Sequence, residues 1–245
     1  MPQGLLEENP RGEAESSAGR TLAEGVPGYP KTFAEAPAGW WNGILAKRAL
    51  DTLLAGVGLL SSSPLCGLIA LAIKLEDRGP IFYGQDRVGK GGKVFQVLKF
   101  RSMVPDAEGA VGPLQSAHGD ARVTRVGRFL RATALDELPQ LWNILVGHMS
   151  FVGPRALRPG EIEVNGRGEC APLEAIPGYA ERHAVVPGLT GLAQVYAPRD
   201  IPRIQKFRYD VLYIRRRTLW LDLRLIAVSL WISVRGRWEH RARKF

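Results

Sequence analysis

The sequence predicts a mostly helical α/β protein that is monotopic, entering a membrane from one side through a helix near its N-terminus. Three observations predict this fold class. Residues 52–73 carry no charge, residues 79–103 follow the pattern of a β-hairpin, and residues 138–145 place apolar side chains at helical spacing. We expect three parts: a tail (1–39), a membrane-anchoring segment (40–78) and a cytoplasmic domain (79–245).

The tail is expected to be disordered, because residues 1–39 are rich in Glu, Gly, Pro, Ala and Ser and lack apolar periodicity. No basic region leads into an apolar stretch there, so a cleaved signal peptide is not expected. The chain has a formal net charge of +9, and residues 199–245 hold 13 basic against 4 acidic residues. A basic C-terminal end indicates an anionic membrane surface or nucleic acid as partner. Two cysteines and four scattered histidines predict neither a disulfide framework nor a metal cluster.

The uncharged run of the anchor has 22 residues, which meets the ~20 needed to cross a bilayer. Trp40 and Trp41 precede it as interfacial residues. Near its middle lie Ser63 and Pro64, where a proline bends a helix and serines satisfy the freed carbonyls. Basic residues flank both ends, which opposes a single crossing. A re-entrant hairpin is therefore favoured over a kinked span, and over a buried core helix.

The predicted hairpin has strands on either side of a glycine-rich turn at residues 89–92. This turn lacks the Lys-Ser/Thr pair of a phosphate-binding loop, so its nucleotide signal is weak. Lys99 and Arg101 fall on one face of the second strand, from which they could reach a functional site. An ordinary polar strand face explains that spacing equally well. Residues 104–121 are expected to form a loop.

Residues 122–155 combine arginines at three-residue spacing with an adjacent pair of acids. The arginines lie near one helical ridge, where they could bind phosphates or lipid head groups, although a solvated basic face explains any one of them. They are Arg122, Arg125, Arg128 and Arg131.

The acids Asp136 and Glu137 precede a predicted helix with Thr133 as its N-cap, Pro139 in its first turn and Gly147 as its stop. Exposed N–H groups at a helix start, or a divalent metal, would offset the repulsion between a carboxylate and a phosphate. Acids are equally common in first turns without a function. The apolar stripe of this helix comprises Leu138, Leu141, Trp142 and Leu145, and its polar face comprises Asp136, Gln140 and Asn143.

The remainder of the chain is expected to be irregular around short helices at 156–184, followed by a turn and a short strand at 187–195. Residues 206–213 predict a helix in which Asp210 lies among basic residues, as in a surface ion pair. Residues 219–234 predict an interfacial helix, because their charges argue against a second span and tryptophans and a basic tail accompany them. A core helix with a basic tail is the alternative.

Six motifs carry a family resemblance that extends over about residues 47–236. They are Gln85-x-Arg87-Val-Gly, Lys99-Phe-Arg101-Ser-Met, Thr124-Arg-Val-Gly-Arg-Phe-Leu-Arg, Leu135-Asp-Glu-Leu-Pro-Gln-Leu-Trp-Asn, Met149-Ser-Phe-Val-Gly-Pro-Arg and Pro187-Gly-Leu-Thr-Gly-Leu-Ala-Gln. Together they resemble the bacterial sugar transferase family, the monotopic polyprenyl-phosphate phosphoglycosyl transferases.

This resemblance implies a re-entrant helix broken at Ser63-Pro64 and a small α/β domain with interfacial amphipathic helices, on the cytoplasmic face of the bacterial inner membrane. It implies transfer of a sugar-1-phosphate from a UDP-sugar to undecaprenyl phosphate, with release of UMP and with Mg²⁺ as cofactor. Such a reaction would initiate synthesis of exopolysaccharide, O-antigen, capsule or glycoprotein glycans.

By the same resemblance Asp136 is the nucleophile and Glu137 assists it, while Lys99 and Asp210 are also catalytic. Asp136 would form an acyl phosphate that polyprenyl phosphate then displaces, as in covalent catalysis, and is also the expected metal ligand. Arg155 of the Gly-Pro-Arg turn would clamp a phosphate through its planar fork. The further candidates for substrate binding are Arg101, Arg125, Arg128 and Gln140.

Two positions depart from the family pattern: His148 replaces an Asp, and Ala156 replaces a Pro. A non-catalytic membrane-bound nucleotide-sugar-binding or scaffold protein is therefore the alternative function. Nucleic-acid binding lacks any accompanying motif and is not expected. The partners expected are the UDP-sugar, undecaprenyl phosphate and membrane lipids. Nothing in the sequence identifies the sugar or the pathway, and a homo-oligomer is left open.

Overall fold

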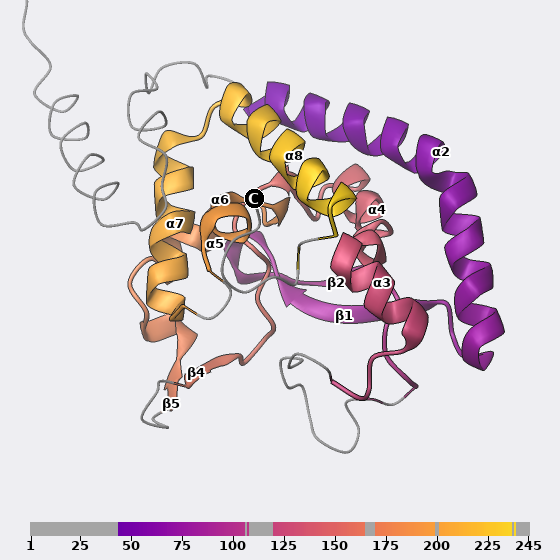
Figure 1. Ribbon diagram of the computed structural model, residues 1–245. Coiled ribbons are helices and arrows are strands. Elements are labelled where there is room, and N and C mark those ends of the chain that lie inside the picture. The colour runs from indigo at the N-terminus through magenta and orange to yellow at the C-terminus, as the bar shows by residue number, and fades with distance from the viewer. Residues whose placement is uncertain are drawn as a thin grey trace, which may run out of the picture.

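The computed structural model describes residues 44–105, 107, 120–164, 170–198, 201–236 and 238. In this part of the chain, seven α-helices and three two-stranded sheets form a mixed α/β structure (Figure 1). The predicted tail, the two tryptophans before the anchor and most of the basic residues that follow residue 234 lie outside the described residues. The helices are α2 (Ile44–Asp77), α3 (Arg125–Thr133), α4 (Gln140–Leu145), α5 (Tyr179–His183), α6 (Leu192–Tyr196), α7 (Arg203–Arg216) and α8 (Leu219–Val234). The strands are β1 (Phe82–Val88), β2 (Val94–Phe100), β3 (Ser150–Val152), β4 (Ile162–Val164), β5 (Cys170–Pro172) and β6 (Gly188–Thr190), and single 3₁₀ turns η2, η3 and η4 cover Lys90–Gly92, Leu135–Glu137 and Leu173–Ala175.

Helix α2 is continuous over 34 residues and contains Pro64. The predicted break at Ser63-Pro64 is therefore not confirmed; the helix bends instead, as Figure 1 shows. Pro64 cannot donate to the carbonyl of Leu60, four residues earlier, because it has no N–H. The hydroxyl of Ser63 donates to that carbonyl at 2.8 Å instead. Because the orphaned acceptor is satisfied locally, the proline bends the helix without ending it.

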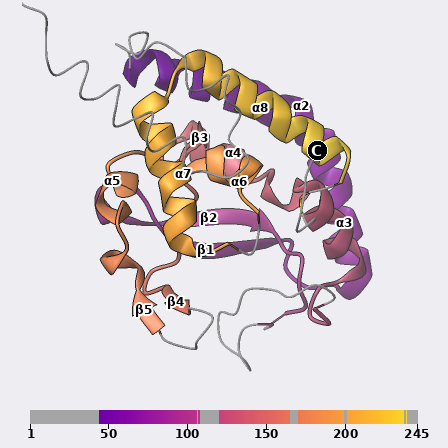
Figure 2. The same cartoon turned by 60° about the vertical axis from the view of Figure 1, so that its left-hand side comes forward.

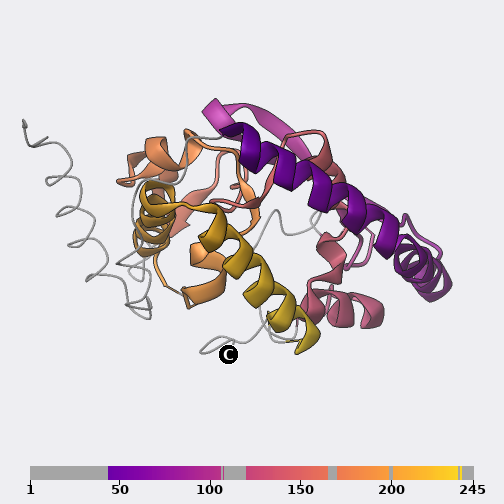
Figure 3. The ribbon, with the colours of Figure 1, turned by 90° about the horizontal axis from the view of Figure 1, so that it is seen from above.

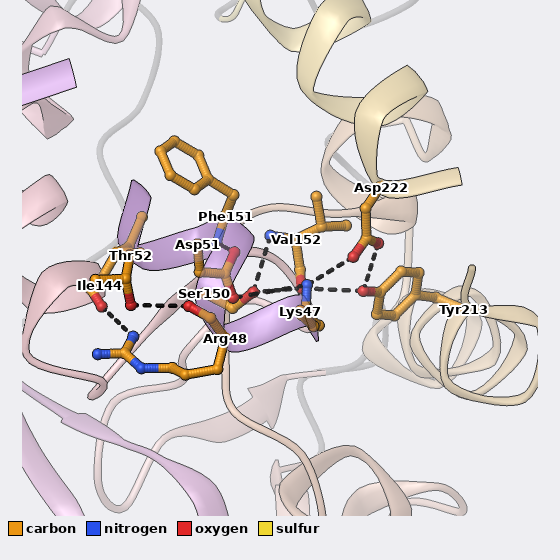
Figure 4. A network of polar contacts seen from close by, with 10 residues as sticks. All are labelled: Lys47, Arg48, Asp51, Thr52, Ile144, Ser150, Phe151, Val152, Tyr213 and Asp222. Atoms are coloured by element: carbon orange, nitrogen blue, oxygen red, sulfur yellow. Dashed lines mark hydrogen bonds and ion pairs between the residues drawn. The ribbon is translucent and has the colours of Figure 1, made fainter. Parts of the chain in front are cut away.

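The first turns of α2 are fixed to the rest of the molecule by a buried polar network (Figure 4). The ammonium of Lys47 pairs with Asp222 of α8 at 2.7 Å, and Asp222 also accepts a hydrogen bond of 2.8 Å from Tyr213 of α7. Asp51 accepts from the backbone N–H of Phe151 in β3 at 3.1 Å. This network joins α2 to α7, α8 and β3.

The far end of α2 is fixed to the same domain. Glu76 accepts from the N–H groups of Arg125 and Val126, at 2.7 and 3.2 Å, at the start of α3. Asp77 pairs with Arg101 just after β2. Both ends of the helix therefore lie against one domain, with the bend between them.

The sides of α2 and α8 that face away from the domain are apolar. Only 11% of the most apolar window of α2 is buried, which excludes a core helix, and α2 is long and apolar enough to cross a membrane. Figures 1, 2 and 3 place α2 and α8 along the same side of the molecule. Their exposed large apolar side chains are Leu45, Leu53, Val57, Leu60, Leu65, Leu68, Leu71 and Leu75 of α2, and Trp220, Leu223, Leu230, Trp231 and Val234 of α8.

The predicted hairpin is confirmed: β1 and β2 pair antiparallel, from Phe82 opposite Phe100 to Val88 opposite Val94.

Helix α8 has the predicted bounds, and α7 contains the predicted helix. The strand predicted within residues 187–195 is only partly correct, because β6 ends at Thr190 and the following residues form α6. Strand β6 pairs parallel with β3, and α6, α7 and α8 pack beside this pair around the buried side chains Tyr209, Leu212, Leu225 and Ile232.

Candidate active site

The acid pair lies on the 3₁₀ turn η3, between α3 and α4. The prediction that Thr133 caps the next helix is wrong: Thr133 ends α3, and its hydroxyl donates back to the carbonyl of Phe129 at 2.8 Å. Ala134 then turns the chain with a left-handed φ of 58°, a conformation that a non-glycine residue adopts only under strain. Asp136 and Glu137 thus precede α4, which begins after Pro139.

Glu137 is held by two cations. The ammonium of Lys99 lies 2.7 Å from Glu137 Oε1, and a guanidinium nitrogen of Arg155 lies 3.1 Å from the same oxygen. Burial alone would raise the pKa of this carboxyl, but the two cations hold it at about 2. Glu137 is therefore ionised at all physiological pH values and fixed in place.

Asp136 has the opposite environment. Its residue is 8% exposed, and in the described part of the chain no hydrogen bond or ion pair holds its carboxylate. Burial, together with the charge of Glu137, raises the pKa of Asp136 to about 6, against the opposing effects of Lys99 and Arg131. Two adjacent carboxyls with pKa values driven apart carry different roles in catalysis. A carboxylate without a partner and with raised basicity is suited to be the nucleophile.

Asn143 holds α4 against β2 and so places the acids beside Lys99. Its side-chain oxygen accepts from the N–H of Leu98 at 3.0 Å, and its nitrogen donates to the carbonyl of Gln96 at 2.8 Å. The predicted polar face of the helix is thus buried along with Leu141 of the predicted apolar stripe, whereas Trp142 of that stripe is 52% exposed. Asn143 is a positioning residue that the helical pattern identified only as polar.

Arg155 follows β3 through a turn in which Gly153 lies against Gly188 of β6. A Cβ added to Gly188 would collide with the backbone nitrogen of Gly153, so only glycine permits this approach. The backbone carbonyl of Arg155 accepts a hydrogen bond of 2.6 Å from Arg182 of α5, and Arg182 pairs with Asp210 of α7 at 3.1 Å.

Asp210, expected to be catalytic, lies apart from the cavity beside the acids. Asp210 is 3% exposed, bonds to Arg182 and does not line the cavity beside the acids. Its contacts suit a positioning role through Arg182 and the backbone of Arg155, and its catalytic role stays a prediction. Arg182 itself was missed by sequence reasoning, since an arginine 28 positions from its acid gives no local signal.

Three predicted substrate-binding arginines also lie elsewhere. Arg101 is buried and binds Asp77 and the carbonyls of Pro80 and Met103, so it joins α2 to β2. Arg125 and Arg128 lie on the exposed surface of α3 and do not line the cavity. None of these three arginines lines the cavity beside the acids, and their role in substrate binding stays a prediction.

A small cavity beside Glu137 does gather other predicted residues. Its size is about 20 Å³, and its lining side chains include Arg87, Lys99, Glu137, Gln140 and Arg155. Arg87 belongs to a motif that the sequence singled out without a role. Ala156, one of the two departures, also lines the cavity and accepts a hydrogen bond of 3.0 Å from Arg87 through its backbone. The other departure, His148, is exposed, packs against Phe95 and does not line the cavity.

The residue expected to bind Mg²⁺ is Asp136. Among the described residues, no group of three or more His, Cys, Asp or Glu side chains could hold a metal ion. Mg²⁺ is usually held by one or two carboxylates together with substrate phosphates and water. The Asp136 carboxylate, which no side chain or backbone group among the described residues binds, fits that mode of binding.

Comparison with known proteins gives the family. The chain is 41% identical over 199 residues to the undecaprenyl-phosphate glucose phosphotransferase of Komagataeibacter xylinus, covering 79% of this chain and 36% of the relative. It is 41% identical over 184 residues to the UDP-N-acetylgalactosamine-undecaprenyl-phosphate N-acetylgalactosaminephosphotransferase of Aeromonas hydrophila, covering 74% and 41%. It is 40% identical over 188 residues to the exopolysaccharide production protein PSS of Rhizobium leguminosarum bv. phaseoli, covering 75% and 92%.

The chain thus spans about two fifths of the length of the first two relatives and nearly all of the third. The profile of the bacterial sugar transferase family matches residues 42–236, a range that contains α2, the acid pair and α8. The chain belongs to the bacterial sugar transferase family.

Proposed function

We propose that this protein transfers a sugar-1-phosphate from a UDP-sugar to undecaprenyl phosphate and releases UMP. The observation that carries the proposal is the asymmetry of the acid pair. Glu137 is fixed by Lys99 and Arg155, whereas the buried carboxylate of Asp136 has a raised pKa and, within the described part of the chain, no hydrogen-bond or ion-pair partner. The names of the relatives support this donor class and this acceptor. Because relatives of equal identity are named for glucose and for N-acetylgalactosamine, the sugar is left open.

In the first step, an oxygen of Asp136 attacks the phosphorus that bears the sugar. An O–P bond forms to the carboxylate, the bridging P–O bond of the diphosphate breaks, and UMP departs with the bond's electron pair. In the second step, a phosphate oxygen of undecaprenyl phosphate attacks the same phosphorus and the carboxylate of Asp136 leaves. One nucleophile therefore serves two displacements, as ping-pong kinetics require.

The other residues of the site prepare these steps. Lys99 and Arg155 offset negative charge on the phosphoryl oxygens and keep Glu137 ionised beside Asp136. The negative charge of Glu137 helps to keep Asp136 basic. Mg²⁺, held by Asp136 and the substrate phosphates, would supply further charge neutralisation.

The membrane arrangement follows from the anchoring of α2. Both of its ends bind one domain, so we propose that the helix enters the membrane at its bend and returns to the same side. The apolar sides of α2 and α8 would contact lipid, with α8 lying in the interface. The domain would face the cytoplasm, where UDP-sugars are made, at the inner membrane.

The proposal is tested in nanodiscs that contain undecaprenyl phosphate, with a panel of UDP-sugars and UMP release as the readout. The wild type should release UMP with at least one donor, and Asp136→Asn should release none. Full UMP release by Asp136→Asn would disprove the role of Asp136. UDP-sugar binding by the wild type without any turnover would favour a non-catalytic binding protein.

A further inference from the structure

The cavity beside the acid pair holds more positive than negative charge. Three cationic side chains, Arg87, Lys99 and Arg155, line it together with the single carboxylate of Glu137. Lys99 and Arg155 bond the same oxygen of that carboxylate. Burial and the nearby charges of Arg155 and Arg158 lower the pKa of Arg87 to about 10. Such crowding of cations favours an anion in the cavity.

Gln140 supplies an unused donor at the same place. Its residue is 3% exposed, and its side-chain nitrogen is buried without a hydrogen-bond partner. Asn143, one turn later on α4 and equally buried, shows the contrast, because both ends of its amide bond β2. An unpaired buried amide destabilises a protein, so its presence beside a cavity points to a ligand acceptor.

The size of the cavity limits what can enter. Its enclosed part, of about 20 Å³, holds roughly one or two oxygen-sized groups, and the cavity opens to solvent beyond them. The surrounding cations favour an oxygen of an anion over a neutral hydroxyl. Arg87 is held by the carbonyl of Ala156 at 3.0 Å and by the side chain of Gln85, so its charge is fixed at the cavity.

We infer that Gln140 and Arg87 form a subsite for a single oxygen of a phosphoryl group, whose other oxygens face Lys99 and Arg155. The inference rests on the proposed function, since the phosphoryl group belongs either to the UDP moiety of the donor or to the polyprenyl phosphate acceptor. Gln140 is then a substrate-binding residue that donates through its amide nitrogen. Without ligand, the unpaired side-chain nitrogen of Gln140 lowers the stability of the protein.

The test compares Gln140→Leu with Gln96→Leu in nanodiscs, with UMP and a short-chain polyprenyl phosphate as separate ligands. Gln96 is an exposed residue of β2 that does not line the cavity, so its variant is the matched control. Gln140→Leu removes an unpaired polar group from a buried position, so without ligand it should unfold at the wild-type temperature or above. It should bind UMP or the polyprenyl phosphate about tenfold more weakly or worse, while the control binds both normally.

Weakened binding of UMP alone assigns the oxygen to the nucleotide, and weakened binding of the lipid alone assigns it to the acceptor; either supports the subsite. Gln140→Glu keeps the length of the side chain but adds negative charge, and should bind the affected ligand more weakly than Gln140→Leu. Unchanged affinity of Gln140→Leu for both ligands would overturn the inference. A lower unfolding temperature for Gln140→Leu without ligand would also overturn it, because Gln140 would then be structural. Wild-type protein that binds UMP but releases none from any UDP-sugar would refute the proposed function and leave the subsite standing.

Discussion

Lowering the pH from 8 to 5 should slow the first displacement about tenfold, because only ionised Asp136 can attack phosphorus. Without a bound metal ion the pKa of Asp136 is about 6, so the carboxyl is almost fully ionised at pH 8 and about one tenth ionised at pH 5. An aspartate of ordinary pKa, near 3.9, would lose less than about a tenth of its ionised form over the same range. The acid limb of the rate profile therefore reports the environment of this one carboxyl.

The measurement is the single-turnover burst of UMP in the absence of the lipid acceptor, across pH 4.5 to 8.5. Omitting undecaprenyl phosphate matters, because a phosphate monoester itself titrates near pH 6, whereas the diphosphate of the donor does not titrate there. The variant Glu137→Gln tests the direction of the pKa shift of Asp136. It removes a charge that raises the pKa of Asp136, so its acid limb should move to lower pH. A wild-type burst rate that stays constant down to pH 4.5 would refute the reasoning.

Three further changes test the positioning of the site and the membrane face. Lys47→Met leaves the buried carboxylate of Asp222 without its cation and should lower the free energy of unfolding by about 3–5 kcal/mol. Denaturant titration in detergent measures this change, and a loss below about 1 kcal/mol would contradict the prediction. Asp210→Asn should slow the UMP burst roughly tenfold or more by loosening Arg182 and the backbone of Arg155, and an unchanged burst rate would argue against the positioning role. Leu60→Asp should reduce liposome flotation at least tenfold, because a carboxylate in the bilayer costs about 2.5–3.5 kcal/mol. The control Lys90→Asp, at an exposed position of the hairpin, should float normally. Equal flotation of the two variants would exclude α2 as the lipid face.

The elements that sequence predicted best are those whose signal is local and repeated. The β-hairpin has alternating strands around a glycine-rich turn, and α8 is a long, mostly apolar segment that begins after the capping Thr218. Predictions of helix ends from single residues failed where a neighbouring residue changed the local backbone hydrogen bonding. Pro64 predicted a break, but the hydroxyl of Ser63 satisfies the carbonyl that the proline leaves free. Thr133 has the chemistry of an N-cap, but the left-handed turn at Ala134 makes it the end of α3, and alanine gives no sign of such a turn.

The sequence predicted the residues that line the cavity better than it predicted the contacts of the residues around it. Lys99, Glu137, Gln140 and Arg155 lie together, as the family motifs implied. Arg101 was placed on the same strand face as Lys99, but its partner, Asp77, lies 24 positions earlier, at the end of α2. Partners of this kind depend on how distant elements pack, and no spacing rule contains that information.

The roles of Asp210 and the arginines of α3 illustrate a second limit. A motif identifies which residues matter without stating whether they touch the substrate or hold a residue that does. Asp210 supports Arg155 through Arg182, and Arg125 serves the start of α3 through its backbone N–H. Only the side-chain contacts show which residue each of them holds.

The asymmetry of the acid pair is tested most directly by trapping the covalent intermediate. Wild-type protein in nanodiscs is mixed with UDP-sugar without acceptor, quenched in acid, digested and examined by mass spectrometry for a phosphosugar adduct. The account predicts one adduct, on Asp136, which disappears when undecaprenyl phosphate is added and never forms in Asp136→Asn. An adduct on Glu137, or rapid product formation with no adduct on either acid, would contradict it.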